Sequence, residues 1–162
     1  MYKIILIALL YTLSYSSNIH RVIDGDTVVL RDTTKIRLLY IDTPEKSPSQ
    51  KLNKALSRTS ITKDTMKAMG MRSQEFLEDI LGTKTIGVNI SKLDIYGRSL
   101  AVLQIEGQAD PVNLQMVEYG YACVYRKAKY PKEYLEAENS AKTRRVGLWS
   151  TNFLEMSALC KP

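Results

Sequence analysis

Histidine is almost absent from this 162-residue sequence, in which His20 is the only one. Zinc hydrolases usually bind their metal through several histidine or cysteine side chains, and Ser-His-Asp catalysis requires a positioned histidine. The composition therefore argues against both mechanisms. If the chain is an enzyme, carboxylates, arginines and a hard metal ion must carry out its chemistry.

Cysteine is equally scarce, with two residues, Cys123 and Cys160, at no spacing typical of a metal or redox motif. A disulfide between them would tie down the C-terminal end of the chain. Two free thiols are an equally good interpretation. The sequence leaves both arrangements open.

The apolar run near the N-terminus, Ile4–Leu13, is about half as long as the ~20 residues that a membrane-spanning helix needs. It follows Lys3 and precedes small residues, which predicts a signal peptide over residues 1–17, cleaved near Ser16 or Ser17. A first buried strand and an uncleaved membrane anchor are the alternatives. We expect export, secreted or periplasmic, without permanent membrane association once the signal is removed, and a membrane-anchored form if it is not.

The remaining composition indicates one folded domain. Hydrophobic residues make up 44% and charged residues 25% of the chain, as in ordinary globular proteins. Lysine and arginine number 23 against 17 acidic residues, and the net charge of +6 suits a polyanionic partner, either nucleic acid or an anionic membrane. We expect the domain to span residues 18–150, followed by a C-terminal tail over 151–162.

Short β-branched runs between turn signals predict five strands, at 19–23, 27–31, 35–41, 85–90 and 99–105. Apolar periodicity and helix-start signals predict three helices, over 65–81, from Asp110-Pro111 onward, and over 131–145. Five strands with a helix after the third indicate an α+β, mainly β fold, a five-stranded Greek-key barrel of the OB type with three helices.

Residues 43–63 are predicted to form a loop between the third strand and the first helix. After Glu45 this loop has five basic residues and no acidic ones: Lys46, Lys51, Lys54, Arg58 and Lys63. Such a loop could guide a polyanion towards a site, or it could be a solvated flexible segment. Both interpretations remain open.

Charged residues suited to chemistry gather in three segments. The first is Asp24-Gly25-Asp26-Thr27, where a bend at glycine can direct a carboxylate towards a cation. The second runs from Arg37 to Glu45 and includes Asp42 at the end of a predicted strand. The third, Asp94–Ala101, places Arg98 at the start of a strand.

Together these segments supply ligands for a hard cation and groups that bind phosphate. Calcium prefers several oxygen ligands, including carboxylates and backbone carbonyls. Arginines pair with phosphates and stabilise charge in a transition state, and a glutamate can orient or deprotonate water. Turn residues and surface ion pairs explain any one segment alone, but three such segments in one small barrel favour a catalytic site.

The chain resembles the staphylococcal nuclease family over about residues 20–150. The resemblance rests on DGDT at 24–27, RLLYIDTPE at 37–45, DIYGRSLA at 94–101, VNLQMVEYGYACVY at 112–125, YLEAENSAK at 134–142 and GLW at 147–149. The order of these strings and the step from Arg37 to Asp42 follow the family pattern. One departure is Ile95, which stands where some members carry a lysine.

The resemblance implies a metal site. Asp26 and Asp42 match the carboxylate ligands of a calcium ion, and Thr43 matches the residue whose backbone carbonyl completes the protein ligands. Asp24 resembles a nearby supporting carboxylate.

The resemblance also implies catalytic roles. Glu45 matches the proposed general base, and Arg37 and Arg98 match the arginines that hold the scissile phosphate. Arg98 is the better candidate for assisting the leaving group. Tyr96 and Tyr125 are candidates for contact with the nucleotide.

A calcium-dependent nuclease follows from this resemblance, one that hydrolyses phosphodiester bonds of DNA or RNA endonucleolytically and leaves 3′-phosphate ends. The alternative is a nucleic-acid-binding barrel without activity. Such a module would usually have lost one of four residues that are all present, namely Arg37, Asp42, Glu45 and Arg98. We expect a monomer with a nucleic-acid substrate and no stable protein partner.

Overall fold

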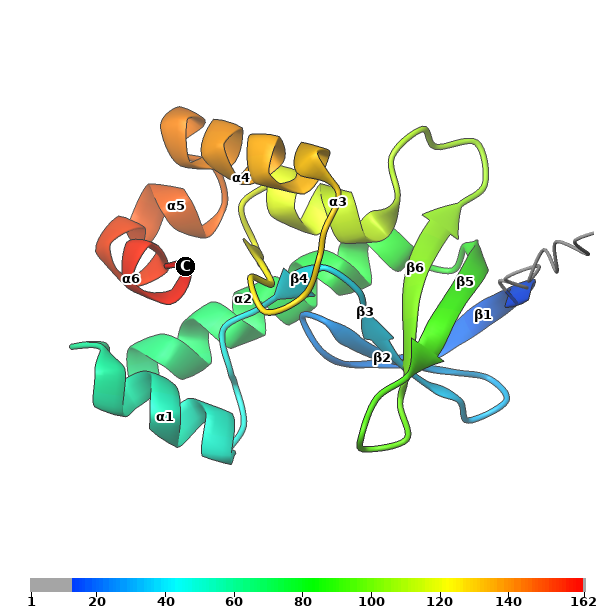
Figure 1. Cartoon of the computed structure of the whole chain (residues 1–162), viewed down its shortest axis with the longest axis horizontal. Coiled ribbons are helices and arrows are strands. Elements are labelled where there is room, and N and C mark those ends of the chain that lie inside the picture. Colours follow the sequence, from blue (N-terminus) through cyan, green and yellow to red (C-terminus); the bar gives the residue numbers. More distant parts are fainter. Residues whose placement is uncertain (1–12, 162) are drawn as a thin grey trace, which may run out of the picture.

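The computed structural model describes residues 13–161, which fold around a closed five-stranded barrel (Figure 1). The strand order is β1–β2–β3–β6–β5, with bounds β1 Leu13–Asp24, β2 Thr27–Leu30, β3 Lys35–Leu38, β6 Ser99–Ile105 and β5 Thr85–Leu93. Neighbouring strands are antiparallel except β3 and β6, which are parallel. The expected barrel of an α+β, mainly β fold is confirmed.

Alternate residues of the strands fill the barrel interior. In β6 the residues Ser99, Ala101, Leu103 and Ile105 are buried, and those between them are partly exposed. This period of two is the pattern expected for a strand with one face in the core. The same core includes Val28, Leu30, Ile36, Leu38, Ile86 and Val88 from the other strands.

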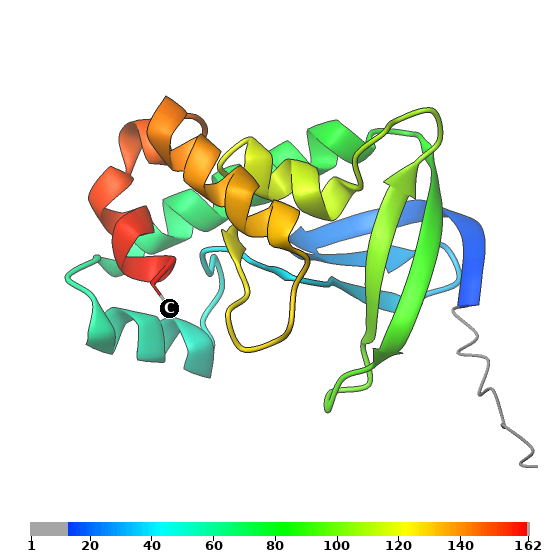
Figure 2. The ribbon, with the colours of Figure 1, turned by 45° about the horizontal axis from the view of Figure 1, so that its top comes forward.

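Three helices correspond to those expected from the sequence: α2 Lys63–Leu81, α3 Val112–Glu118 and α4 Lys132–Arg144. Figures 1 and 2 show α3 and α4 packed together beside α2. Leu77 of α2 and Met116 of α3 extend the barrel core. The helices therefore cover one side of the barrel and share its hydrophobic interior.

The structure adds three helices to the expected set: α1 Gln50–Arg58, α5 Leu148–Thr151 and α6 Phe153–Leu159. Helix α1 replaces part of the loop predicted over 43–63, and α6 lies in the predicted tail. Helix α1 forms because Ser49 caps its first turn and Leu52 is buried beside Met66 of α2. Helix α6 buries Met156 in a cluster with Trp149.

A second, two-stranded sheet joins β4 (Ile41–Asp42) to β7 (Cys123–Val124). The strands are antiparallel, with Ile41 opposite Val124 and Asp42 opposite Cys123. Asp42, a candidate metal ligand, is therefore held by backbone pairing with a segment about eighty residues away in the chain.

The third strand ends earlier than the predicted range 35–41. Tyr40 has a φ of 69°, a left-handed conformation that interrupts a strand. Leu38 and Ile41 are consequently both buried, although unbroken alternation would place them on opposite faces. Asn113 holds this bend, since its Nδ2 donates to the Leu39 carbonyl oxygen at 3.0 Å.

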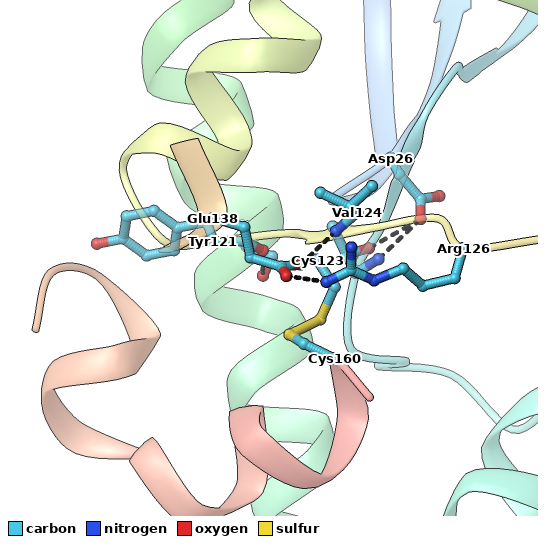
Figure 3. The surroundings of a disulfide bond; sticks show 9 residues. Asp26, Tyr121, Cys123, Val124, Arg126, Glu138 and Cys160 are labelled. Carbon is cyan, nitrogen blue, oxygen red and sulfur yellow. Dashed lines mark hydrogen bonds and ion pairs between the residues drawn. A yellow bond between two sulfur atoms is a disulfide. The ribbon is translucent and has the colours of Figure 1, made fainter. Parts of the chain in front are cut away.

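A disulfide joins Cys123 to Cys160 (Figure 3). It connects β7 to the residue that ends α6. Of the two arrangements that the sequence left open, the structure has the bridge. The C-terminal helix is therefore tied to the strand that pairs with Asp42.

Strand β1 begins inside the segment predicted as a signal peptide. Residues 13–18 pair with β5, from Leu13 opposite Ile90 to Asn18 opposite Thr85. Residues 1–12, with most of the apolar run, lie outside the described residues. Over the part of the chain that is described, no helix is both long and apolar enough to cross a bilayer. Cleavage near Ser16 or Ser17 would remove most of the pairing between β1 and β5.

Helix α2 has a glycine at the point where the chain leaving β4 crosses it. A Cβ on Gly70 would lie 2.7 Å from both the Lys46 nitrogen and the Pro44 carbonyl oxygen, and 2.9 Å from the Glu45 carbonyl carbon. All three are main-chain atoms, so no side chain can turn aside to make room. Gly70 therefore sets the path of the segment that carries Glu45.

Replacement of Gly70 by alanine tests this close approach. In an ordinary helix interior alanine is favoured over glycine by about 1 kcal/mol. Here the added methyl group must displace the main chain of residues 44–46, and we expect a net loss of about 1–3 kcal/mol in the free energy of unfolding. Urea unfolding of Gly70→Ala against the parent measures it. A variant at least as stable as the parent would show that the segment does not pack closely on α2.

The disulfide should contribute substantially to stability. Its cysteines are 37 residues apart, and closing a loop of that length corresponds to about 4 kcal/mol in the chain-entropy treatment. Urea unfolding of the parent should therefore shift to lower urea when dithiothreitol is added, whereas Cys123→Ser/Cys160→Ser should unfold at the same urea concentration with or without it. Two titratable thiols in the folded, non-reduced parent would contradict the bridge.

Candidate functional site

Arg37 brings Asp26 and Asp42 together. The arginine lies within β3, with Thr27 of β2 and Leu100 of β6 as its Cα partners. Its Nη2 lies 3.0 Å from Asp26 Oδ2 and 2.9 Å from Asp42 Oδ1. Two carboxylates from separate segments are thus directed at one cationic group.

Asp26 is buried and fixed by several donors. Its Oδ2 accepts hydrogen bonds from the backbone nitrogen and the Oγ1 of Thr43, both at 3.1 Å. Its Oδ1 accepts from Thr27 Oγ1 at 3.1 Å. Thr43, predicted to offer its carbonyl to a metal, therefore lies directly beside a predicted carboxylate ligand.

Gly25 allows the turn before Asp26 to approach the rest of the site. A Cβ at this position would lie 2.6 Å from Ser73 Cβ and 2.9 Å from Thr43 Cγ2. Only glycine fits between α2 and the segment after β4. The glycine in the DGDT string therefore serves close packing of the site.

The acidic cluster consists of Asp24, Asp26, Asp42 and Glu45. Its surroundings and charges shift the pKa values of Asp24 and Arg37. Burial raises the pKa of Asp24 to about 6, and the negative charge of Asp26 acts in the same direction. Burial alone would lower the pKa of Arg37, but the surrounding carboxylates outweigh it and raise that pKa above its ordinary value. These carboxylates are, from the strongest effect to the weakest, Asp26, Asp42, Asp24 and Glu45.

Glu45 lies on the segment between β4 and α1, two residues beyond Thr43. Its side chain is partly exposed, and its Oε2 accepts a hydrogen bond from Ser49 Oγ at 3.3 Å. Its charge acts on Arg37, so it belongs to the same electrostatic cluster. Asp26, Arg37, Asp42 and Thr43 are thus in direct contact, and Glu45 is close enough for its charge to act on Arg37.

Arg98 directly precedes β6, and Asp94 holds its side chain. Its Nε donates to Asp94 Oδ2 at 2.8 Å, and its backbone nitrogen donates to Asp94 Oδ1 at 2.9 Å. Its guanidinium also lies over the ring of Tyr96, 5.6 Å from the ring centre. Leu100, two residues later, pairs with Arg37, so Arg98 directly precedes the strand that lies beside Arg37.

The two candidate tyrosines have different settings. Tyr96, at the tip of the β5–β6 hairpin, is 77% exposed. Tyr125 follows β7 directly, is 36% exposed, and donates its backbone N–H to the Tyr40 carbonyl oxygen at 2.7 Å.

Two features near the site were not found from the sequence. Ser49 contacts Glu45, and its role as a helix cap could have been inferred only if α1 had been predicted. Gly70 looks like an unfavourable residue in a helix until the crossing segment is seen. The sequence around Ser49 or Gly70 does not by itself predict the contact that each residue makes.

A second acidic group, Glu138, lies beside the disulfide (Figure 3). It accepts a hydrogen bond from the Val124 nitrogen at 2.7 Å and pairs with Arg126. Because the neighbouring sulfurs are bonded to each other, they are not thiolate ligands for a metal. The role of Glu138 is to hold β7 and the chain that follows it.

Comparison with known proteins agrees with the family resemblance seen in the sequence. The family model for staphylococcal nuclease homologues matches residues 35–151, a range that includes Arg37, Asp42, Thr43, Glu45 and Arg98 and begins after Asp26. The chain is 37% identical to an uncharacterised protein of Methanocaldococcus jannaschii, over 84% of this chain and 72% of that protein.

Two further relatives have names that describe an activity. A micrococcal nuclease of Shigella flexneri is 31% identical over 84% of this chain and 74% of its own length. An uncharacterised endonuclease of Haemophilus influenzae is 30% identical over 82% of this chain and 65% of its own length. These matches confirm the expected enzyme class, a hydrolase of phosphodiester bonds. The chain belongs to the staphylococcal nuclease homologue family.

Proposed function

We propose that this chain is a calcium-dependent nuclease that cleaves DNA or RNA endonucleolytically and leaves 3′-phosphate ends. The observation that carries the proposal is the convergence of Asp26 and Asp42 from two segments, within electrostatic reach of Glu45. The names of the nuclease relatives support a nucleic-acid substrate. The net charge of +6 agrees with a polyanionic substrate.

The residues at this point suit a calcium ion. Asp26 and Asp42 would bind it through carboxylate oxygens, and Thr43 through its backbone carbonyl, which are the hard donors that calcium prefers. Both carboxylates already approach the same cationic nitrogen of Arg37, so their charge is concentrated where a cation is favoured. When bound, calcium would neutralise phosphate charge and make water a better nucleophile.

Glu45 is assigned to the attacking water. It lies on the segment of Thr43, so a water molecule beside the metal ligands would be within its reach. A carboxylate there can orient the water and accept its proton as the new bond to phosphorus forms. Its partial exposure leaves room for a substrate.

Arg37 and Arg98 are assigned to the scissile phosphate. Guanidinium groups bind phosphate oxygens through paired hydrogen bonds and stabilise the charge that develops during attack. The Arg98 side chain is 30% exposed and is oriented by Asp94, so it can meet a substrate on the outer face of the barrel. It is the better candidate for assisting the leaving oxygen. Tyr96 and Tyr125, both exposed, are assigned to contact with the nucleotide.

The first test is the metal dependence of cleavage. The full chain should cut labelled single-stranded or duplex DNA in calcium and not in a chelator, and a polymerase should extend the products only after phosphatase treatment removes 3′-phosphates. Asp42→Asn should require more calcium for half-maximal activity, whereas Asp110→Asn, an exposed aspartate on another surface, should not. A folded protein that shows no cleavage with any metal ion would instead be the non-catalytic nucleic-acid-binding barrel.

A second test concerns the assigned side chains. Glu45→Gln and Arg98→Ala should each lower kcat about 10²-fold or more, because each removes a group that acts in the transition state. The matched controls are Glu106→Gln and Arg31→Ala, which change exposed residues of the same type elsewhere on the molecule. Unchanged cleavage by either site variant, measured with calcium in excess, would refute its assignment.

We also propose that the protein is exported. Export with cleavage near Ser16 or Ser17 remains our expectation, and it is supported by the apolar run after Lys3. The exported protein is proposed to be a monomer without a stable protein partner.

N-terminal sequencing of the protein recovered outside the cytoplasm tests this expectation. A chain that begins at Ser17 or Asn18 would support cleavage, and its barrel would lack most of the pairs between β1 and β5. A chain that keeps Leu13 and the residues before it would show instead that this segment remains part of the first strand.

A further inference from the structure

We propose that Ser49 is a positioning residue that orients Glu45 for catalysis, an inference that rests on the proposed role of Glu45. Ser49 Oγ donates a hydrogen bond to Glu45 Oε2 at 3.3 Å. The same oxygen accepts the backbone N–H of Leu52 at 2.9 Å, as the N-cap of α1. One hydroxyl thus joins the start of a helix to the assigned base.

The two bonds of this hydroxyl cooperate. A serine hydroxyl has a single proton and two lone pairs. Because the N–H of Leu52 occupies one lone pair, Oγ is fixed relative to α1, and its only proton is left for the carboxylate. The bond to Glu45 therefore has a defined direction that a freely rotating serine would not have.

Helix α1 is itself fixed in place. Leu52 is 2% exposed and packs in a cluster with Ile61 and Met66, against which Leu159 of α6 also packs. The Ser49 carbonyl oxygen accepts the N–H of Asn53 at 3.1 Å. The cap therefore belongs to a packed part of the fold, and it transmits that rigidity to Glu45.

The start of a helix is also a favourable place for a carboxylate. The unpaired N–H groups of the first turn give it a partial positive charge. Gly70 of α2 sets the main chain of Glu45 from the other side. Main chain and carboxylate are thus positioned by two different helices, which leaves the side chain few orientations.

Substitutions at Ser49 separate capping from positioning. Alanine removes both the cap and the proton donor. Glycine is tolerated at an N-cap almost as well as serine, and it has no hydroxyl proton to donate and adds no charge beside Glu45. Threonine keeps both functions. Capping alone and positioning therefore predict different results for Ser49→Gly.

The test measures melting temperature, kcat and KM of the full chain with calcium in excess. We expect Ser49→Ala to lower both Tm, by about 2–4 °C, and kcat, by about 10-fold or more. Ser49→Gly should stay close to the parent in Tm but show the low kcat of the alanine variant. Ser49→Thr should restore both. KM of the alanine variant should stay close to that of the parent.

Thr62→Ala is the matched control. Thr62 caps α2 through the Thr65 nitrogen at 3.1 Å and is exposed. Its loss should lower Tm like the loss of Ser49 and leave kcat unchanged. A kcat that follows Tm across all variants, or a fully active Ser49→Gly, overturns the role of Ser49.

Glu45→Gln, measured beside these variants, distinguishes failure of the Ser49 positioning role from failure of the Glu45 assignment. An inactive Glu45→Gln together with fully active Ser49→Ala and Ser49→Gly variants would refute the positioning role alone. A fully active Glu45→Gln would remove the assigned base, and the role of Ser49 with it.

Discussion

The ion pairs of Arg37 with Asp26 and Asp42 are the interaction on which the site depends. Asp24 and Asp26 lie in a partly or fully buried turn, where their negative charges repel each other and hydrogen bonds to neutral donors compensate them less well than a cation does. Arg37 provides that cation from the middle of β3, where pairing with β2 and β6 fixes its position. The barrel register thus determines where the two carboxylates can meet.

Much of this arrangement could be predicted because it follows from short-range pattern. The run of apolar and β-branched residues over 99–105 predicts β6, although its alternating burial is not visible in the sequence itself. The spacing from Arg37 to Asp42 already places a strand before a turn. The resemblance then assigned roles to residues that the structure brings together. The error at the end of the third strand has a different origin. Tyr40 takes a positive φ because buried Asn113 holds the neighbouring carbonyl, and an interaction with a helix seventy residues later is not encoded in the local alternation.

The features that the sequence did not reveal depend on long-range partners. Helix α1 has a polar, lysine-containing sequence with few apolar residues, and it is stabilised by burying Leu52 against residues that follow it in the chain. Helix α6 is held by a cysteine whose partner lies in β7. Gly70 lowers helix propensity, so a reading of the helix alone would count it as a defect. In each case the local signal is weak or misleading, and tertiary contact decides the structure.

These long-range partners converge on the candidate site. Through the disulfide, α6 is joined to Cys123, which lies opposite Asp42 in the small sheet. Through Leu159, the same helix packs against the cluster that anchors α1, whose cap contacts Glu45. One C-terminal segment therefore supports both a proposed metal ligand and the proposed base. A reaction that needs its water between a metal and a base requires the two to keep a constant separation, because misplacement by about 1 Å can cost 10²-fold in rate. Because α6 contacts the supports of both groups, it links the position of the proposed metal ligand to that of the proposed base.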